Sequence, residues 1–193
     1  IADEAKGKHV LRVIDKLEKV GVDNIRAELG AGRVDDSGDP IPGVHLDEMT
    51  IEAMLSFIAI QGDSRAEVVA KMREALPESE LAVRALGEMT QLDKCLDALG
   101  VPVSQARFAP SLARGLDYYT GPVYEIAIAE GRFGSVGGGG RYDGLVARFL
   151  ERPIACAGIA FGLDRLMAAL AFLGITPRVP AQSQVLVAFV GRV

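Results

Sequence analysis

Hydrophobic residues recur at helical spacing through the first hundred residues of the chain. In the first segment the aliphatic side chains lie three or four positions apart and charged residues fill the opposite face; they are Val10, Val13, Ile14, Leu17 and Val20. This pattern predicts an amphipathic helix that ends at Gly21, then a short helix from about 23 to 29. Further helices are predicted over 47–60 and 64–76, where Ser64 and Glu67 have the spacing of a capping box.

A longer helix is predicted from about 78 to 99, because apolar residues keep a rhythm of about 3.5 positions there. These residues are Leu81, Ala85, Met89, Leu92, Leu96 and Leu99, and we expect them to form a seam against another helix. Gly100 and Pro102 end the pattern. Residues 30–45 are rich in Gly, Pro and Asp, which predicts an exposed loop.

The second half of the chain changes to β-branched runs and glycines. Period-two segments predict an antiparallel sheet, with strands over 105–110, 123–130 and 133–138. A short helix or turn is expected over 141–150, a buried strand over 156–161 and a helix over 163–173 that turns Leu166, Met167, Leu170 and Leu173 inward. A linker over 175–183 then leads to a strand over 184–190. The fold class is therefore α+β, a helical region followed by an antiparallel sheet with helices.

The composition argues against some classes of function. The chain has 193 residues, 49% hydrophobic and 24% charged, as in soluble globular domains. A net charge of −5 argues against a broad RNA-binding surface. The two cysteines and two histidines lack the spacing of metal ligands, so no metal site is expected.

The most apolar window, 154–175, has the length of a membrane span. Asp164 and Arg165 lie in its middle, and this argues for a buried strand followed by a helix and against a membrane segment. The first residue is Ile1 and no basic-then-apolar signal follows it. We therefore expect the chain to start inside a longer protein.

Candidate binding residues are concentrated between Arg114 and Gly144. Arginine offers a planar fork of donors that suits a carboxylate or phosphate, and tyrosines supply flat walls for a planar polar group. The glycine run 137–140 lets a ligand approach the main chain, although alone it also fits a hairpin loop. Likewise Arg114 alone could pair with Asp117. Together, the residues favour a pocket for a small polar or charged ligand.

The order of these motifs resembles a known family. Residues 114–121 read Arg-Gly-Leu-Asp-Tyr-Tyr-Thr-Gly and residues 139–145 read Gly-Gly-Arg-Tyr-Asp-Gly-Leu. Both resemble the histidine-recognition motifs of histidyl-tRNA synthetases. Residues 158–166, Gly-Ile-Ala-Phe-Gly-Leu-Asp-Arg-Leu, resemble motif 3 of class II aminoacyl-tRNA synthetases, with Asp164 where glutamate is usual.

The resemblance implies a division of the chain: a helical insertion domain over 1–78, the C-terminal part of a class II catalytic domain over 79–175, and a linker with the first strand of an anticodon-binding domain over 176–193. It also implies an activity, the ATP- and Mg²⁺-dependent activation of histidine to histidyl-adenylate and its transfer to tRNA(His). The family is cytoplasmic, and the full-length protein is expected to be a homodimer without membrane contact.

The resemblance further assigns roles by position. Arg114 matches the arginine that contacts the reacting carboxylate and α-phosphate, so it is the candidate catalytic residue. Histidine is expected to contact Arg114, Tyr118, Tyr119, Gly138, Gly139, Gly140 and Tyr142. Because paired tyrosines on a strand alternate faces, Tyr118 is expected to pack inward. Gly162 and Arg165 match the ATP site, and the start of a helix favours an anion there.

Motifs 1 and 2 have no candidate in the sequence, so we expect a fragment that is inactive alone. The main alternative is the related non-catalytic regulatory subunit of ATP phosphoribosyltransferase in histidine biosynthesis. Such relatives tend to lose the catalytic arginines, whereas Arg114 and Arg165 are present here. A helical RNA-binding or scaffolding module is a second alternative, which the acidic balance disfavours.

Overall fold

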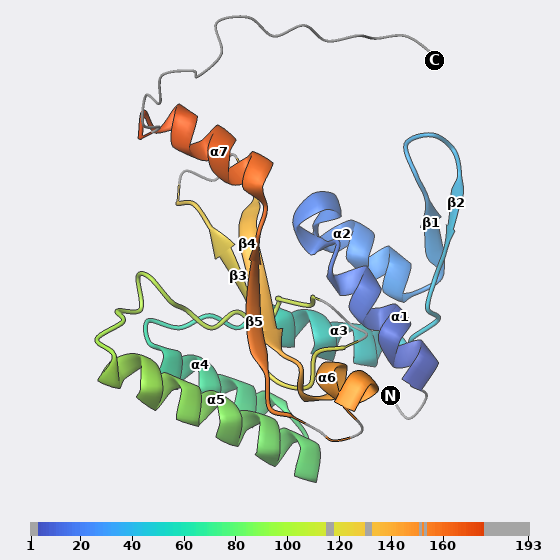
Figure 1. The fold of residues 1–193 in the computed structure, drawn as a ribbon. Coiled ribbons are helices and arrows are strands. Elements are labelled where there is room, and N and C mark those ends of the chain that lie inside the picture. Colours follow the sequence, from blue (N-terminus) through green and yellow to red (C-terminus); the bar gives the residue numbers. More distant parts are fainter. Residues whose placement is uncertain (1–3, 115–117, 130–132, 151, 153, 176–193) are drawn as a thin grey trace, which may run out of the picture. The chain divides into compact units, whose positions relative to one another are not determined.

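The computed structural model describes residues 4–114, 118–129, 133–150, 152 and 154–175. Two compact units are present: Ile1–Tyr124 with Gly139–Ile159, and Glu125–Gly138 with Ala160–Val193. Figure 1 shows the elements of both. Most of the predicted linker and the whole strand expected over 184–190 lie outside the described residues, and the three predicted domain boundaries stay predictions.

The first unit begins with two helices, α1 (Glu4–Ile14) and α2 (Leu17–Leu29). The predicted single helix up to Gly21 therefore breaks earlier, after Ile14. Gly21 itself interrupts α2, because its φ of 79° is a left-handed value that glycine adopts without a steric cost. The helix end predicted at Gly21 is therefore a kink inside α2, and the break after Ile14 was not predicted.

A small β-hairpin replaces the loop predicted over 30–45. Strands β1 (Gly32–Val34) and β2 (Pro40–Pro42) pair antiparallel, with Arg33 opposite Ile41. The chain after the hairpin then completes helix α2: the amides of Val44, Leu46 and His45 donate to the carbonyls of Glu28, Leu29 and Gly30 at 2.9, 3.0 and 2.8 Å. These carbonyls have no partner within a helix, so the hairpin return satisfies groups that the helix end leaves open.

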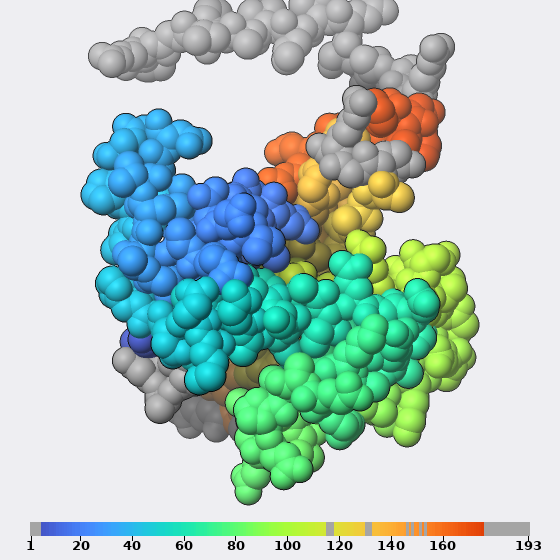
Figure 2. Space-filling view, turned by 180° about the vertical axis from the view of Figure 1, so that it is seen from behind, coloured from blue at the N-terminus to red at the C-terminus, as the bar shows by residue number. Residues whose placement is uncertain are grey.

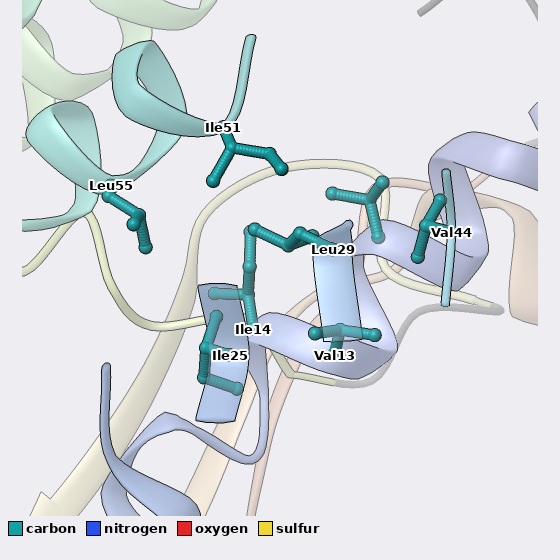
Figure 3. Close-up of a cluster of buried hydrophobic side chains, with 8 residues drawn as sticks. Val13, Ile14, Ile25, Leu29, Val44, Ile51 and Leu55 are labelled. Atoms are coloured by element: carbon teal, nitrogen blue, oxygen red, sulfur yellow. The ribbon is translucent and has the colours of Figure 1, made fainter. Parts of the chain in front are cut away.

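The main hydrophobic core of the first unit joins α1, α2, the hairpin return and α3 (Glu48–Ile58). Figure 3 shows aliphatic side chains from these elements converging; the buried set is Val10, Val13, Ile14, Ile25, Leu29, Val44, Ile51 and Leu55. Ile25 and Leu29 are fully buried. The helical spacing seen in the sequence thus marks a real core face. Ala113 also packs against this cluster.

Helix α4 (Arg65–Ala75) confirms the predicted capping residues. The Ser64 hydroxyl accepts a hydrogen bond from the Glu67 amide at 3.1 Å. The Glu67 carboxylate in turn accepts from the amide of Asp63, at 2.8 Å, instead of from Ser64 as in the standard capping box. The two helix starts at Asp47 and Ser79 are capped by side chains in the same way.

Helix α5 (Glu80–Ala98) packs beside α4, and Figure 2 shows both on one face of the first unit, in teal and green. The predicted seam is wrong at both ends, because Leu81 and Leu99 are 67% and 77% exposed. Leu86, outside the predicted stripe, is the buried residue of this helix. Met89, Leu92 and Leu96 in the middle of the predicted stripe are half-buried, so the buried side of the helix overlaps the stripe there and extends to Leu86.

Arg65 fixes the segment that follows α5. Its buried guanidinium pairs with Asp93 at 2.6 Å and with Asp97, and it donates to the carbonyls of Val101 and Ala106 at 3.1 and 3.0 Å. The segment 105–110 is irregular, and the strand predicted there is wrong. An arginine has five donors and can therefore hold several carbonyls of an irregular chain. The alternation of apolar and polar residues, from which the strand was predicted, does not report such contacts.

A three-stranded sheet has the order β3–β4–β5, formed by Val123–Ala127, Ser135–Arg141 and Ala157–Phe161. The amides of Tyr142 and Gly162 donate to the carbonyls of Cys156 and Val136, both at 2.8 Å, which is antiparallel pairing of β4 with β5. The predicted strands at 123–130 and 156–161 are confirmed with shorter bounds. The burial predicted for the second of these is wrong, because Ile159 and Phe161 on β5 are 49% and 57% exposed. The strand predicted over 133–138 starts and ends later, because the glycine run lies within β4.

Two helices follow strands of this sheet: α6 (Asp143–Leu150) and α7 (Leu163–Phe172), both predicted. On α7, Ala169 is fully buried whereas Met167 is 45% exposed, so the inward orientation expected of Met167 is wrong. Within the described part of the chain, no helix combines the length and apolar character needed to cross a membrane.

Candidate functional site

Three tyrosines form an aromatic cluster in the first unit. The ring centres of Tyr118 and Tyr119 are 4.3 Å apart, and Tyr142 lies 6.3 Å from Tyr118 and 6.4 Å from Tyr119. The rings are tilted or edge-on to one another, the arrangements that aromatic pairs favour. The two sequence motifs, more than twenty positions apart, therefore meet in space.

The tyrosine hydroxyls are linked to each other. Tyr118 donates a hydrogen bond to the hydroxyl of Tyr119 over 3.2 Å. This hydrogen bond, with partial burial, raises the pKa of Tyr119 above its usual value. Tyr119 is therefore a neutral phenol at physiological pH, able to donate or accept a hydrogen bond.

The expectation that Tyr118 packs inward is wrong. Tyr118 is 42% exposed, and Tyr119 is the more buried ring. Strand alternation does not apply, because residues 118 and 119 lie in a turn before β3 begins at Val123. Both rings therefore belong to the same cluster.

The glycines of β4 serve close packing against their neighbours. A methyl group at Gly140 would lie 2.8 Å from both the Tyr119 ring and the Pro122 carbonyl oxygen. At Gly139 it would lie 1.8 Å from the carbonyl oxygen of Gly158 on β5, where Tyr124 donates its own hydroxyl at 2.6 Å. The run is neither a flexible loop nor a turn, because it lies within β4, and at Gly139 and Gly140 a side chain would collide with the neighbouring strand or ring.

Arg114 is half-buried and is the last described residue before position 118. Its positive charge acts on the hydroxyl of Tyr119, which places the guanidinium within electrostatic reach of the cluster. Ala113, its neighbour in the chain, packs against the helical core. The alternative pairing of Arg114 with Asp117 falls outside the described residues.

Gly138, Gly162 and Arg165 belong to the second unit. Gly162 precedes α7, and its amide donates to the carbonyl of Val136 at 2.8 Å. Arg165 lies in the first turn of α7, is exposed, and donates from Nη1 to the carbonyl of Ser135 at 3.1 Å. A cation at the start of a helix, where amide groups are open, is suited to an anionic ligand.

Sequence reasoning missed the residues that fix the Tyr142 backbone. Hydrogen bonds from side chains and main chain connect four residues around it: Thr120, Arg141, Asp143 and Cys156. Arg141 and Asp143 are part of the quoted motif, so their position was visible in the sequence. Their mutual ion pair, with Nε 2.8 Å from Oδ2, required the structure.

The described residues in the first unit form a surface with three aromatic rings, a hydrogen-bonded pair of tyrosine hydroxyls and a nearby cation. Such a surface can bind a small planar polar group that carries an anion. A separate cavity of about 220 Å³ between α4 and α5 is lined by Ala66, Val69, Ala70, Arg73, Thr90 and Asp93 and shares no residue with the tyrosine cluster. The fold and the site thus define a mixed α and β protein with a small antiparallel sheet and a cluster of tyrosines next to the ends of its strands.

Comparisons with known proteins agree on one family. The model of the histidyl-tRNA synthetase family matches residues 10–166. A histidine–tRNA ligase of Ruegeria pomeroyi is 43% identical over 179 residues, which is 88% of this chain and 36% of the relative. The corresponding ligase of Paracoccus denitrificans is 41% identical over 184 residues, 91% of this chain and 37% of the relative. The chain belongs to the histidyl-tRNA synthetase family.

Solved structures share the fold. The histidyl-tRNA synthetase of a Nostoc species superposes with a TM-score of 0.76 at 32% identity, over 93% of this chain and 40% of that one. A Bacillus halodurans protein described as an ATP phosphoribosyltransferase regulatory subunit/histidyl-tRNA synthetase has a TM-score of 0.65 at 24% identity, over 88% and 39% of the two chains. The second likeness shows the fold alone. The chain spans little more than a third of the length of the curated relatives it matches.

Proposed function

We propose that the full-length protein containing this chain is a histidine–tRNA ligase. It activates histidine with ATP to give histidyl-adenylate and pyrophosphate, then transfers the histidyl group to tRNA(His). The observation that carries this proposal is the meeting of Tyr118, Tyr119 and Tyr142 beside Gly140, in a chain of this family. The aromatic surface fits an imidazole, and Arg114 supplies a charge for the carboxylate.

Arg114 acts as the electrostatic catalyst in this proposal. In the first step the histidine carboxylate attacks the α-phosphate of ATP, so two anions must come together. A guanidinium beside both groups lowers the repulsion between them and stabilises the charge that develops in the transition state. The position of Arg114 near Tyr119 supports this role.

Tyr118, Tyr119 and Tyr142 line the imidazole subsite, and Gly139 and Gly140 shape its floor. The contact of Gly138 with histidine stays a prediction from the motif. Arg165 holds the γ-phosphate of ATP at the start of α7, and Gly162 leaves room for the nucleotide. Mg²⁺ would add positive charge at the phosphates. Within the described ranges no three His, Cys, Asp or Glu side chains gather as a metal site.

The described surface is open on the tyrosine side, since Tyr118 is 42% exposed. Ligand pockets usually bury most of the ligand surface. The rest of the pocket is therefore assigned to parts of the full-length protein that this chain does not include, and the chain alone is expected to be inactive. The full-length protein is expected to be a homodimer in the cytoplasm.

Histidine-dependent exchange of pyrophosphate into ATP tests the proposal on the full-length protein. Exchange with histidine and with no other amino acid is expected. Histidine binding without exchange would favour the regulatory-subunit alternative. Absence of both would contradict either function.

The role of Arg114 is tested by Arg114→Ala in the same protein. We expect kcat/KM for exchange to fall roughly 30- to 1000-fold. This corresponds to a loss of about 2–4 kcal/mol of transition-state stabilisation, as when an oxyanion donor is removed. Arg12→Ala, at an exposed position on α1, is the matched control and should leave exchange unchanged. Near-normal exchange by Arg114→Ala would remove the catalytic role.

A further inference from the structure

Hydrogen bonds hold the backbone around Tyr142 from two neighbouring chain segments. The amide and carbonyl of Arg141 bond the carbonyl of Pro122 and the amide of Thr120 at 3.0 and 2.8 Å. The amide of Tyr142 donates to the carbonyl of Cys156 at 2.8 Å. Three chain segments, the first histidine motif, the second motif and the start of β5, therefore meet at this residue.

Asp143 connects the same three segments through its own groups. Its carboxylate accepts from Nε of Arg141 at 2.8 and 3.0 Å, and from the amide of Cys156 at 3.2 Å. Its amide donates to the hydroxyl of Thr120 at 3.0 Å. The guanidinium of Arg141 keeps the pKa of Asp143 below its usual value, so the carboxylate is ionised at neutral pH.

The ring of Tyr142 has little freedom inside this frame. A methyl group at Gly158 would lie 2.1 Å from the Tyr142 hydroxyl, so the side chain crosses directly over β5. The other side of the ring faces Tyr118 and Tyr119. A shift of the backbone at 141–143 would therefore move the ring relative to the two tyrosines opposite.

We infer that Asp143 is a positioning residue for histidine recognition: its bridge between Thr120, Arg141 and Cys156 sets the place of the Tyr142 ring in the amino-acid subsite. The inference rests on the proposed function. Asp143 acts through Tyr142 and does not itself touch the substrate. Because small displacements of a binding group cost large factors in affinity, loss of the bridge weakens histidine binding more than ATP binding.

The test is steady-state pyrophosphate exchange by the full-length protein with Asp143→Asn, an isosteric change that removes the charge paired with Arg141. We expect KM for histidine to rise about tenfold while KM for ATP stays within about twofold. Glu52→Gln is the matched control, because Glu52 also pairs with an arginine, Arg26 at 2.6 Å, but lies on α3 far from the motifs in sequence. The control should keep both KM values.

A second pair of variants tests the bridge without changing any charge. Thr120→Val removes the oxygen that accepts from the Asp143 amide, whereas Thr120→Ser keeps it. Thr120→Val should raise KM for histidine severalfold, and Thr120→Ser should leave it near the unsubstituted value. If Asp143→Asn fails to fold, this pair of variants tests the inference in its place. A purely structural role of the bridge would change KM for histidine and KM for ATP alike.

The outcomes distinguish the inference from the proposed function. Unsubstituted protein without histidine-dependent exchange would overturn the proposed function and the inference with it. Normal exchange together with an unchanged KM for histidine in Asp143→Asn or Thr120→Val would overturn the inference alone. Equal increases in KM for histidine and ATP would also overturn it, because they indicate general disorder of the site.

Discussion

Glu28 shows how single residues hold the helical region together. Its carboxylate is 1% exposed and accepts from Lys16 at 3.0 Å and from Arg33 at 2.8 Å. Burial raises the pKa of Glu28, but the hydrogen bonds from Lys16 and Arg33 outweigh burial and bring the pKa below its usual value of 4.5. The ionised carboxylate thus links α2 to the turn that precedes it and to strand β1 of the hairpin.

Replacing Glu28 with glutamine should destabilise the chain by about 2 kcal/mol at neutral pH, because two cations lose their partner at a buried site. This value is at the low end for buried pairs, since Lys16 is 45% exposed and water screens it. Thermal unfolding at pH 7 measures the difference. Glu52→Gln, at a 56% exposed ion pair, should change the unfolding temperature little.

The same residue predicts a pH dependence. A folded-state pKa below 4.5 means that the stabilisation is present above pH 4.5 and disappears as pH falls below that value. The difference in unfolding temperature between the unsubstituted chain and Glu28→Gln should therefore shrink below about pH 4.5. A difference that stayed constant to pH 3 would show that Glu28 does not carry its charge in the fold.

At the scale of elements, β4 depends on its glycines. Gly139→Ala would place a methyl group 1.8 Å from the backbone oxygen of Gly158, which cannot move without displacing β5. We expect a loss of about 3 kcal/mol in the free energy of unfolding, read from denaturant titration. Gly144→Ala, in the first turn of α6 with open space around it, is the control and should not destabilise. Tolerance of Gly139→Ala would contradict the strand spacing described here.

For the first unit taken as a whole, one core joins distant segments. Leu29 is fully buried among residues from α1, the hairpin return and α3, so Leu29→Ala leaves a cavity that touches all of them. We expect a loss of about 2–5 kcal/mol in the free energy of unfolding. Met49→Ala, at an 82% exposed position on α3, should stay within about 0.5 kcal/mol. Similar values for both variants would mean that this core does not stabilise the chain.

Most helices were predictable because each has a local signal. The caps at Asp47, Ser64 and Ser79 lie at the starts of their helices, and the apolar spacing from Val10 onwards marks the face that is buried. The α5 seam was not predictable. Its apolar positions allow several faces, and contact with α4 selected the one that contains Leu86.

The candidate site was only partly predictable for a similar reason. The motifs named Tyr118, Tyr119 and Tyr142, but the strand alternation assumed for the pair failed because the residues lie in a turn. The hydrogen bonds of Asp143 connect Thr120 and Cys156, residues 36 positions apart, and no local pattern reports such contacts.

The sequence by itself determined the family, the α+β class and the motifs that carry the chemistry, since these depend on residue identity and short spacing. The tertiary structure alone decided which residues become neighbours. It converted residues 32–42 from an apparent loop into a hairpin whose return caps α2, and it placed the glycine run within a strand. The physical reason is that backbone partners and close approaches between distant segments are fixed only when the chain packs.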